Sequence, residues 1–454
     1  MREEPDSRNL LSATAFILSV ACVLSSNFVF AQRPPTSGIN LSYLEIDFIR
    51  PGARPAAMGA AFIGAAHDES AGLYNPAGLT FSRRPNVALH FRLFNQTGPA
   101  QSRSGDDDQF SVALILPIKR FRLAYSRHHL LNEELDFFNR QQLSIDSQLT
   151  ARQVLGGLGN FPGKQVLLSL ELVKDNWAIA YEVSKRLSVG FAMQHFILDM
   201  NFDDRTFLDP QIADGSPPRL NLAETTYSIV TSDWSAAYQL APSIGFMANA
   251  IPDKLFVGAV ANAGTRFSLV SRIFLPEYRS AFQTFDVETQ FRAFDFKIPD
   301  SYGLGVYYRA HGRLNLAFDL FRIEYSDILS GNDLNIAADD EFNEQLGIYE
   351  DPDGRPDLTV EDATEVHVGI EWLVRIRKLG LLLPLRFGMY TDPGHRIHAV
   401  SENPDLRRLF PEADDRIHFA FGTGFVFKNG KFDLAVDFAE GYSQIFGSWA
   451  LTLP

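Results

Sequence analysis

Hydrophobic and polar residues alternate with a period of two along much of the chain. The clearest runs are Asn176–Val183, Leu314–Phe321, Ile417–Phe427 and Phe432–Ala439. In each run one set of alternate positions is large and apolar, and the other set is mostly small, polar or charged. In the first run, for example, Trp177 and Ile179 alternate with Ala178 and Ala180. Because successive side chains of a strand point to opposite faces, this pattern predicts many amphipathic β-strands.

Two kinds of all-β protein have such strands. A soluble β-sandwich would bury the bulky set in a core, whereas a transmembrane barrel would turn that set to lipid and line its lumen with the other. The barrel is favoured because charged residues occur in the second set of several strands, as suits a wet lumen. These residues are Glu182, Asp319, Glu365, Glu371, Arg386, Asp433 and Asp437. A soluble sandwich enzyme is the alternative.

The spacing of the strands supports the barrel. About fourteen are predicted, near 86–94, 108–117, 120–130, 166–183, 185–201, 226–250, 254–270, 284–310, 313–327, 362–376, 380–391, 414–427, 430–441 and 444–454. Connections after even-numbered strands are tight turns such as Asn429-Gly430, and the alternation in length is predicted to be strict. Long connections follow the odd-numbered strands, near 95–107, 131–165, 202–225, 271–283, 328–361 and 392–413. Short turns of outer-membrane barrels face the periplasm, so both termini are expected on that side.

Residues 1–31 are typical of a cleaved signal peptide. Arg2 and Arg8 precede an apolar stretch from Leu10 to Val23, and Ala31 ends a small-residue cleavage site. The single cysteine, Cys22, lies inside this segment, so the mature chain is expected to have no thiol chemistry; lipid attachment at Cys22 is the alternative. Beyond it no apolar run reaches about 18 residues, so we expect the chain to cross the membrane with strands.

Composition and charge narrow the function. Hydrophobic residues make up 46% of the chain and aromatic residues 12%, which suits a wall with one apolar and one wet face. The net charge of −14 and the lack of a basic stripe argue against nucleic acid as a partner. Nucleophile-elbow, zinc-protease and phosphate-loop motifs are all missing, so the chain is not expected to be an enzyme.

Residues 51–84 do not alternate and are rich in alanine and glycine, which predicts a compact element inside the lumen. The segment contains Ala57-Met58-Gly59-Ala60-Ala61-Phe62, His67-Asp68-Glu69 and Asn75-Pro76-Ala77-Gly78-Leu79. In this it resembles the N-terminal hatch of the long-chain fatty acid outer-membrane transporters, the FadL-like family. Three departures are Ala60, where the family often has a second glycine, the insertion-like irregularity at Pro55 just upstream, and the last strand, which lacks a terminal aromatic residue. A later segment, Ile298–Val306, resembles a hairpin of the same family.

The resemblance implies a barrel of about fourteen antiparallel strands (85–454), an N-terminal extension and hatch (32–84) and no cofactor. It implies passive uptake of hydrophobic molecules such as long-chain fatty acids across the outer membrane. Release would follow hatch movement or use a side opening in the wall. The hatch and gating residues would be Gly59, Phe62, Asn75, Pro76, Ala77 and Gly78. A structural or secretion-associated barrel of the same fold, acting as carrier or anchor, is the alternative. The expected partners are outer-membrane lipid and hydrophobic small molecules, and the oligomeric state is open.

Individual residues suggest further sites. Asn75-Pro76 predicts a tight turn at which the hatch moves, with a static turn as the alternative. Arg386 is a candidate for binding a substrate carboxylate, or else a lumen salt-bridge partner. His67-Asp68-Glu69 with His128-His129 could bind a metal, but a solvated charge cluster explains them more simply.

An extracellular loop is the candidate for Ca²⁺. The loop at 328–361 is acidic, and Asp351, Asp353 and Asp357 surround a glycine within it. Such spacing of carboxylates suits an oxygen-coordinated cation, although Pro356 interrupts the pattern of a full calcium-binding loop. A solvated acidic loop without an ion is the alternative.

Overall fold

The fold was derived from a computed structural model of the chain. It describes residues 51–96, 109–139, 163–208, 226–274, 278–279, 284–285, 290–330, 358–376, 381–400, 407, 411–427 and 429–453. The predicted signal peptide and the first part of the N-terminal extension therefore lie outside the described residues. Among the described residues, no helix is long and apolar enough to cross a membrane.

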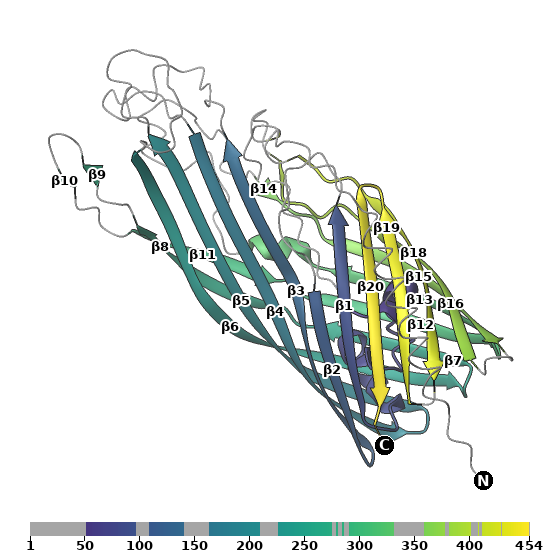
Figure 1. The fold of residues 1–454 in the computed structure, drawn as a ribbon. Coiled ribbons are helices and arrows are strands. Elements are labelled where there is room, and N and C mark those ends of the chain that lie inside the picture. The colour runs from purple at the N-terminus through teal and green to yellow at the C-terminus, as the bar shows by residue number, and fades with distance from the viewer. Residues whose placement is uncertain are drawn as a thin grey trace, which may run out of the picture. The chain divides into compact units, whose positions relative to one another are not determined.

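Sixteen antiparallel strands form one closed wall (Figure 1). They are β1 (Asn86–Gln96), β2 (Gln109–Ile118), β3 (Phe121–Asn139), β4 (Gly163–Ser184), β5 (Leu187–Leu208), β6 (Thr226–Ile251), β7 (Leu255–Asn262), β8 (Thr265–Phe274), β11 (Gln290–Ile298), β12 (Ser301–His311), β13 (Leu314–Ile323), β15 (Ala363–Ile376), β16 (Leu381–Asp392), β18 (Arg416–Phe427), β19 (Gly430–Ala439) and β20 (Tyr442–Thr452). The last strand closes the wall by pairing with the first, from Asn86 opposite Thr452 to Gln96 opposite Tyr442. β7 and β8 follow each other at one position around the wall, and so do β11 and β12. The sixteen strands therefore occupy the fourteen positions that the sequence predicted.

The alternating pattern places side chains as predicted. On β13, Leu316, Phe318 and Leu320 are exposed on the outer surface, and Ala317 and Asp319 are buried inside. The same alternation recurs on β12 and β18. An apolar outer face and a lumen lined by small and charged groups are the properties of a transmembrane barrel.

Two predictions about the wall were wrong. The strands predicted at 254–270 and 284–310 are each broken, at Ala263-Gly264 and at Pro299-Asp300. The connections do not alternate strictly in length, because β19 and β20 are joined at the long-loop end by only Glu440-Gly441. Gly441 has a φ of 69°, a left-handed conformation that suits glycine in a tight turn. Two further pairs of short strands lie outside the wall, β9 (Tyr278–Arg279) with β10 (Thr284–Phe285), and β14 (Leu358–Thr359) with β17 (His398–Ala399).

The two breaks accompany a split in the wall. β6 pairs with β7 from Ser243 to Ile251, and with β8 at Thr231 and Ser232. Among the described residues of β6, none from 233 to 241 pairs with β8. β8 and β11 instead pair with each other along their whole length. We call this unpaired stretch the wall split.

Local sequence explains the wall split. Pro242 has no N–H with which to continue the ladder, although its carbonyl still accepts a hydrogen bond from Ala263. A side chain at Gly264 would overlap the Ile298 carbonyl, so only glycine fits where the two broken strands bend. Pro299 also lacks an N–H, and the Asp300 carboxylate accepts a hydrogen bond from the Gly264 N–H at 2.5 Å. The breaks therefore follow from residues that cannot extend a regular sheet.

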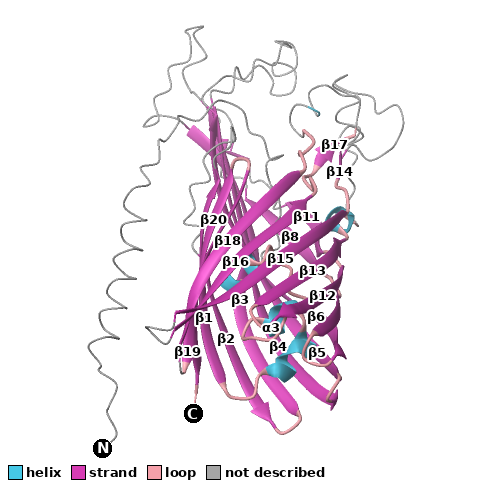
Figure 2. Ribbon diagram, turned by 90° about the vertical axis from the view of Figure 1, so that its right-hand side faces the viewer, coloured by secondary structure: helices cyan, strands magenta, loops and turns pink. Residues whose placement is uncertain are grey.

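The hatch lies within the barrel, on the side of the short turns (Figure 2). It contains α2 (Ala53–Ala57), α3 (Ala71–Tyr74) and the 3₁₀ helix η2 (Pro76–Phe81). α2 packs against β16, β18, β19 and β20, and η2 packs against β3, β4, β5 and β6. The predicted compact element in the lumen is thus present, and it contacts opposite parts of the wall.

Inward-facing glycines let the hatch backbone contact the wall backbone. Three cross-strand pairs form this glycine belt: Gly190 with Gly245, Gly258 with Gly305, and Gly369 with Gly388. A Cβ at Gly369 would lie 2.6 Å from the Met58 carbonyl oxygen, and a Cβ at Gly258 would lie 2.5 Å from the Ile63 carbonyl oxygen. No side chain fits at these positions unless the hatch moves.

We predict that Gly388→Ala displaces the hatch while the barrel still forms. The added methyl group would overlap the Gly59 amide, and a backbone amide cannot rotate away as a flexible side chain can. Chymotrypsin should then cut the folded barrel after Phe62, which is fully buried in the unaltered protein. The matched control is Gly312→Ala, because nothing lies within 4 Å of a Cβ at this turn. Equal protection of Phe62 in the two variants would contradict the prediction.

Candidate functional site

An apolar cluster fills the lumen beyond the hatch, toward the long connections. It comprises the buried side chains of Ile63, Leu130, Leu172, Phe196, Leu198, Ala241, Val260, Phe267, Ile298, Phe321, Ile323, Tyr325, Ile328, Val360 and Ala363. Most come from β3 to β8, β11 and β13, the part of the wall that contains the split. We call this set the lumen apolar cluster.

A cavity of about 70 Å³ lies within this cluster beside the breaks in the strands. Its apolar walls are Leu73, Leu130, Phe196, Ile298, Phe321 and Ile323. An engineered protein cavity that binds benzene measures roughly 150 Å³, so this one is too small for an aromatic ring without some widening. The cavity is therefore a small space within the lumen apolar cluster.

Polar groups lie along one edge of the cavity. The Asn262 side chain accepts a hydrogen bond from Ser243 at 2.6 Å and donates one to Ser301 at 3.1 Å. Gln194 and Lys174 also line the cavity, and the Lys174 ammonium lies 5.8 Å from the centre of the Phe196 ring. A mostly apolar cavity with a few placed polar groups is typical of small-molecule sites.

Phe321 separates this cavity from a groove on the outer surface of the wall. The groove has a volume of about 350 Å³ and is lined by exposed side chains that include Ile244, Phe246, Tyr302 and Leu304. Phe321 lines both the cavity and the groove. One aromatic side chain thus stands between the lumen and the lipid-facing surface.

The hatch closes the lumen beneath the apolar cluster. Leu73 lines the cavity from below, and the Ile63 side chain packs within the cluster. Phe62, a predicted hatch residue, is fully buried, with the Arg54 guanidinium 5.1 Å from its ring centre and the Tyr74 ring 5.2 Å away. These side chains fill the space between the cluster and the end of the barrel with the short turns.

Asn75 holds the hatch together and attaches it to the wall. Its side-chain NH₂ donates to the carbonyl oxygens of Ile63 at 3.1 Å and Phe246 at 2.9 Å. Its side-chain oxygen accepts from the Ala77 N–H at 3.1 Å, so Asn75 caps η2 as the predicted turn requires. Pro76 begins η2, and a Cβ at Gly78 would overlap the Ala66 carbonyl. Movement of the hatch at this turn stays a prediction.

Gly59 and Ala60 both adopt left-handed backbone conformations, with φ of 59° and 57°. Glycine adopts this conformation without strain, whereas alanine loses about 1–2 kcal/mol. The geometry makes Ala60 a strained residue of this hatch.

A buried ion network fixes the α2 end of the hatch to the wall. The Glu371 carboxylate accepts hydrogen bonds from Arg54 at 3.0 Å and from Arg386 at 2.8 Å. Arg386 also pairs with Asp433 at 2.6 Å. Lys431 lies 2.9 Å from Asp68, which in turn pairs with Arg54 at 3.1 Å. The alternating pattern of the sequence predicted that Glu371, Arg386 and Asp433 face the lumen. Which of them form pairs depends on the register of the sheet.

Burial and the neighbouring charges shift the pKa values of Asp68 and His67 in the hatch. Burial raises the pKa of Asp68, but Lys431 and Arg54 outweigh it and hold that pKa well below its usual value. Burial, with a contribution from Arg54, lowers the pKa of His67 to about 3, so this histidine is neutral. A buried ionised aspartate between two cations ties the hatch to the wall electrostatically.

The structure places Arg386 inside this network rather than free in the lumen. A substrate carboxylate would reach its guanidinium only by displacing Glu371 or Asp433. Its observed contacts are those of a lumen salt-bridge partner.

The predicted metal ligands are not brought together. Asp351, Asp353 and Asp357 lie outside the described residues, so the calcium site stays a prediction. His67 lies 5.2 Å from the Tyr307 ring, whereas His128 is buried on β3, in register with Lys174 of β4. Neither histidine belongs to the group of close carboxylates that the described residues contain.

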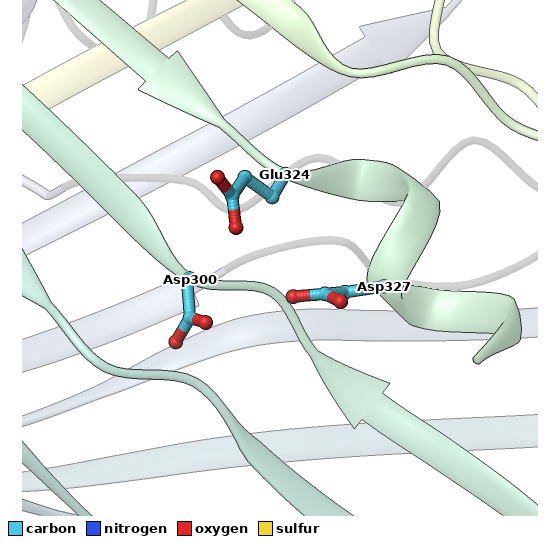
Figure 3. A group of neighbouring side chains, drawn as sticks. All are labelled: Asp300, Glu324 and Asp327. Atoms are coloured by element: carbon cyan, nitrogen blue, oxygen red, sulfur yellow. The ribbon is translucent and has the colours of Figure 1, made fainter. Parts of the chain in front are cut away.

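That group is shown in Figure 3. Asp300 comes from the break before β12, and Glu324 and Asp327 come from the start of the 3₁₀ helix η4 (Tyr325–Leu329), with oxygens within 4.8 Å of one another. Lys297 pairs with Asp327 at 2.5 Å and lies 3.9 Å from Asp300. Because this lysine supplies a positive charge, an ion-paired cluster that stabilises the split accounts for these carboxylates.

A row of aromatic and charged side chains lines the other side of the lumen. Tyr390 stacks between His367 and His418, with ring centres 5.3 and 4.4 Å away. Its hydroxyl donates to Asp437 at 2.8 Å, and Asp437 also contacts His418. The lumen is therefore apolar near the wall split and polar on β15 to β19.

Comparison with known proteins identifies the fold. No protein-family model and no curated protein matches the sequence. A FadL homologue from Pseudomonas aeruginosa is 15% identical over 90% of this chain and 99% of its own, with a TM-score of 0.58. The CymD monoaromatic hydrocarbon channel is 14% identical over the same shares, with a TM-score of 0.56. The Pseudomonas putida toluene transporter TodX is 14% identical over 89% and 98%, with a TM-score of 0.50. The chain therefore has the FadL-like barrel fold, as its hatch motif predicted.

We predict that Glu371→Gln destabilises the folded protein by about 3–5 kcal/mol, because Arg54 and Arg386 would lose their shared buried carboxylate. Urea unfolding in detergent micelles, followed by the gel shift of the folded barrel, measures the change. Asp362→Asn is the matched control, since it breaks the exposed pair with Arg322 and should cost less than about 1 kcal/mol. Similar losses for both variants would show that the network does not hold the fold.

Proposed function

We propose that this protein is an outer-membrane channel through which hydrophobic small molecules diffuse passively into the cell. The observation that carries the proposal is the lumen apolar cluster, which lies between the long connections and the hatch and contains a cavity beside the wall split. An apolar surface of this kind favours solutes that leave water readily. The FadL-like fold supports it, because the similar structures include CymD, a monoaromatic hydrocarbon channel, and TodX, a toluene transporter.

The proposed path begins among the long connections and follows the lumen apolar cluster. The solute then leaves past the hatch, or through the wall beside Phe321 into the outer groove. No step needs an energy source or cofactor, because the concentration gradient drives the movement. Residues 1–31 would direct the chain for export and be cleaved after Ala31.

The alternative function is a structural or secretion-associated barrel. Such a protein needs no apolar cavity above its hatch, whereas a channel does. The cavity and its apolar lining therefore favour the channel.

Uptake of toluene and oleate by bacteria without their own channel tests the proposal. Both compounds are expected to enter faster with this protein than without it, and arabinose, a polar solute, is not. We predict that Phe196→Gln lowers uptake by about tenfold or more, because it removes roughly 1.5–3 kcal/mol of apolar burial from the cavity wall. Phe446→Gln is the matched control, since Phe446 is equally buried but packs against α2, outside the cluster.

Two outcomes would contradict the proposal. One is a folded barrel in the outer membrane that speeds the entry of neither compound, which would favour the anchor function. The other is equal loss of uptake in the Phe196 and Phe446 variants, which would mean that the cluster is not the path.

Lys174 provides a test of the solute class. We predict that Lys174→Met lowers oleate uptake several-fold and leaves toluene uptake unchanged, because only oleate has a carboxylate for the ammonium at the cavity edge. Parallel uptake assays with the two solutes measure the ratio. If the substitution affects both equally, Lys174 shapes the cavity instead of binding a head group.

A further inference from the structure

Ile63 occupies an unusual position in the hatch. Its side chain is fully buried in the lumen apolar cluster, whereas other apolar residues of the hatch, such as Met58 and Phe62, belong to a separate cluster near the short turns. A Cβ at Gly303 would overlap both the Ile63 side chain and the Phe321 ring region, so these two side chains meet over this glycine. The hatch thus meets the proposed path at two residues: Leu73 lines the cavity, and Ile63 packs in the cluster against Phe321, which lines the same cavity.

The backbone of Ile63 is held from both ends. Its N–H donates to the Asp319 carboxylate of β13 at 2.6 Å, and its carbonyl accepts from the Asn75 side chain at 3.1 Å. Asp319 is 1% exposed and Asn75 is fully buried. Short hydrogen bonds to a charged acceptor are the stronger kind, so Asp319 provides the main attachment.

The rest of the hatch is held differently. The α2 end and Asp68 are tied to the wall by the buried ion network of Arg54, Glu371 and Lys431. The Ile63 end has the two hydrogen bonds described above and apolar contacts. Release of the α2 end would break several buried ion pairs, whereas release of the Ile63 end breaks one hydrogen bond to a carboxylate and one to an amide, so the Ile63 end is the part that yields first.

We propose that Ile63 is the stopper of the channel and that Asp319 and Asn75 are positioning residues that hold it closed. The proposal rests on the proposed function and specifies which part of the hatch responds to solute. A solute wider than the 70 Å³ cavity pushes on Phe321, whose ring packs against Ile63. Ile63 then leaves its hydrogen bonds to Asp319 and Asn75, while the ion-paired end of the hatch stays in place.

A single cysteine placed at the stopper tests this directly. The chain has one cysteine, Cys22, so a Cys22→Ser background with Ile63→Cys offers one thiol. Both hydrogen bonds use the backbone of residue 63 and survive this substitution, and cysteine remains a small apolar side chain. The rate of reaction with a water-soluble maleimide in the folded barrel measures how often this residue is exposed.

Asp319→Ala is expected to raise the labelling rate at position 63 by roughly ten- to a hundredfold, the range set by loss of a hydrogen bond to a charged group. Asp319→Asn keeps an acceptor and should raise the rate less. Toluene is expected to raise the rate without any change at Asp319. Thr80→Val is the matched control, because it removes a hatch-to-wall hydrogen bond to Ser188 that does not involve Ile63.

A second thiol position separates local from general loosening. Met58→Cys lies in the part of the hatch beside α2, where we expect neither toluene nor Asp319→Ala to change labelling. Equal increases at positions 58 and 63, or no increase at 63 with Asp319→Ala, would overturn the stopper assignment. The gel shift of each variant confirms a folded barrel, and Asp319→Asn keeps the test decisive if the alanine variant does not fold.

The labelling and uptake experiments together distinguish failure of the stopper assignment from failure of the proposed channel function. If toluene does not cross the unaltered protein but Asp319→Ala still exposes position 63 alone, the channel function fails and the stopper assignment stands. If toluene crosses while labelling at 63 never changes, the channel function stands and the stopper assignment fails.

Discussion

Direct contact between the backbones of the hatch and the wall is the constraint on which the rest of this structure depends. It is possible because the glycine belt leaves the inner surface of six strands without side chains at one level of the barrel. The level of this belt decides where the lumen is closed. It also leaves the space beyond the belt to larger side chains, and these form the lumen apolar cluster.

The hatch is attached by two kinds of interaction with different consequences. Removing one member of the buried ion network would leave an unpaired charge away from water, so the network behaves as a unit and favours a single arrangement. Ile63 has only one hydrogen bond to the Asp319 carboxylate, one to the Asn75 amide and apolar contacts, which can break in part at a smaller cost than the whole network. An attachment that is firm at α2 and weaker at Ile63 is what the proposed response of the hatch to a solute requires, since the hatch then stays in the barrel.

The sequence predicted the parts of this architecture that depend on local pattern. The alternation of apolar and polar residues predicted the strands and which of their side chains face outward. The Ala- and Gly-rich segment with Asn75-Pro76 indicated the hatch. The broken strands were missed because Gly264 and Pro299, each taken alone, can be a local irregularity within a continuous strand. Their joint effect appears only when β8 and β11 are paired. The partners of Arg386 were also open, since Glu371 and Asp433 approach it only through the register of other strands.

The distribution of charge within the lumen constrains the path more than its width does. The ion network and the stacked histidines occupy the side formed by β15 to β19, where an apolar solute would have to separate paired buried charges. The side formed by β3 to β13 offers apolar surface, and it is the side on which the wall is split and Phe321 lies between the lumen and the outer groove. On the proposed path, a solute on the apolar side would meet Phe321, against which Ile63 packs, so the two proposed exits, through the wall and past the hatch, would begin at this pair of side chains.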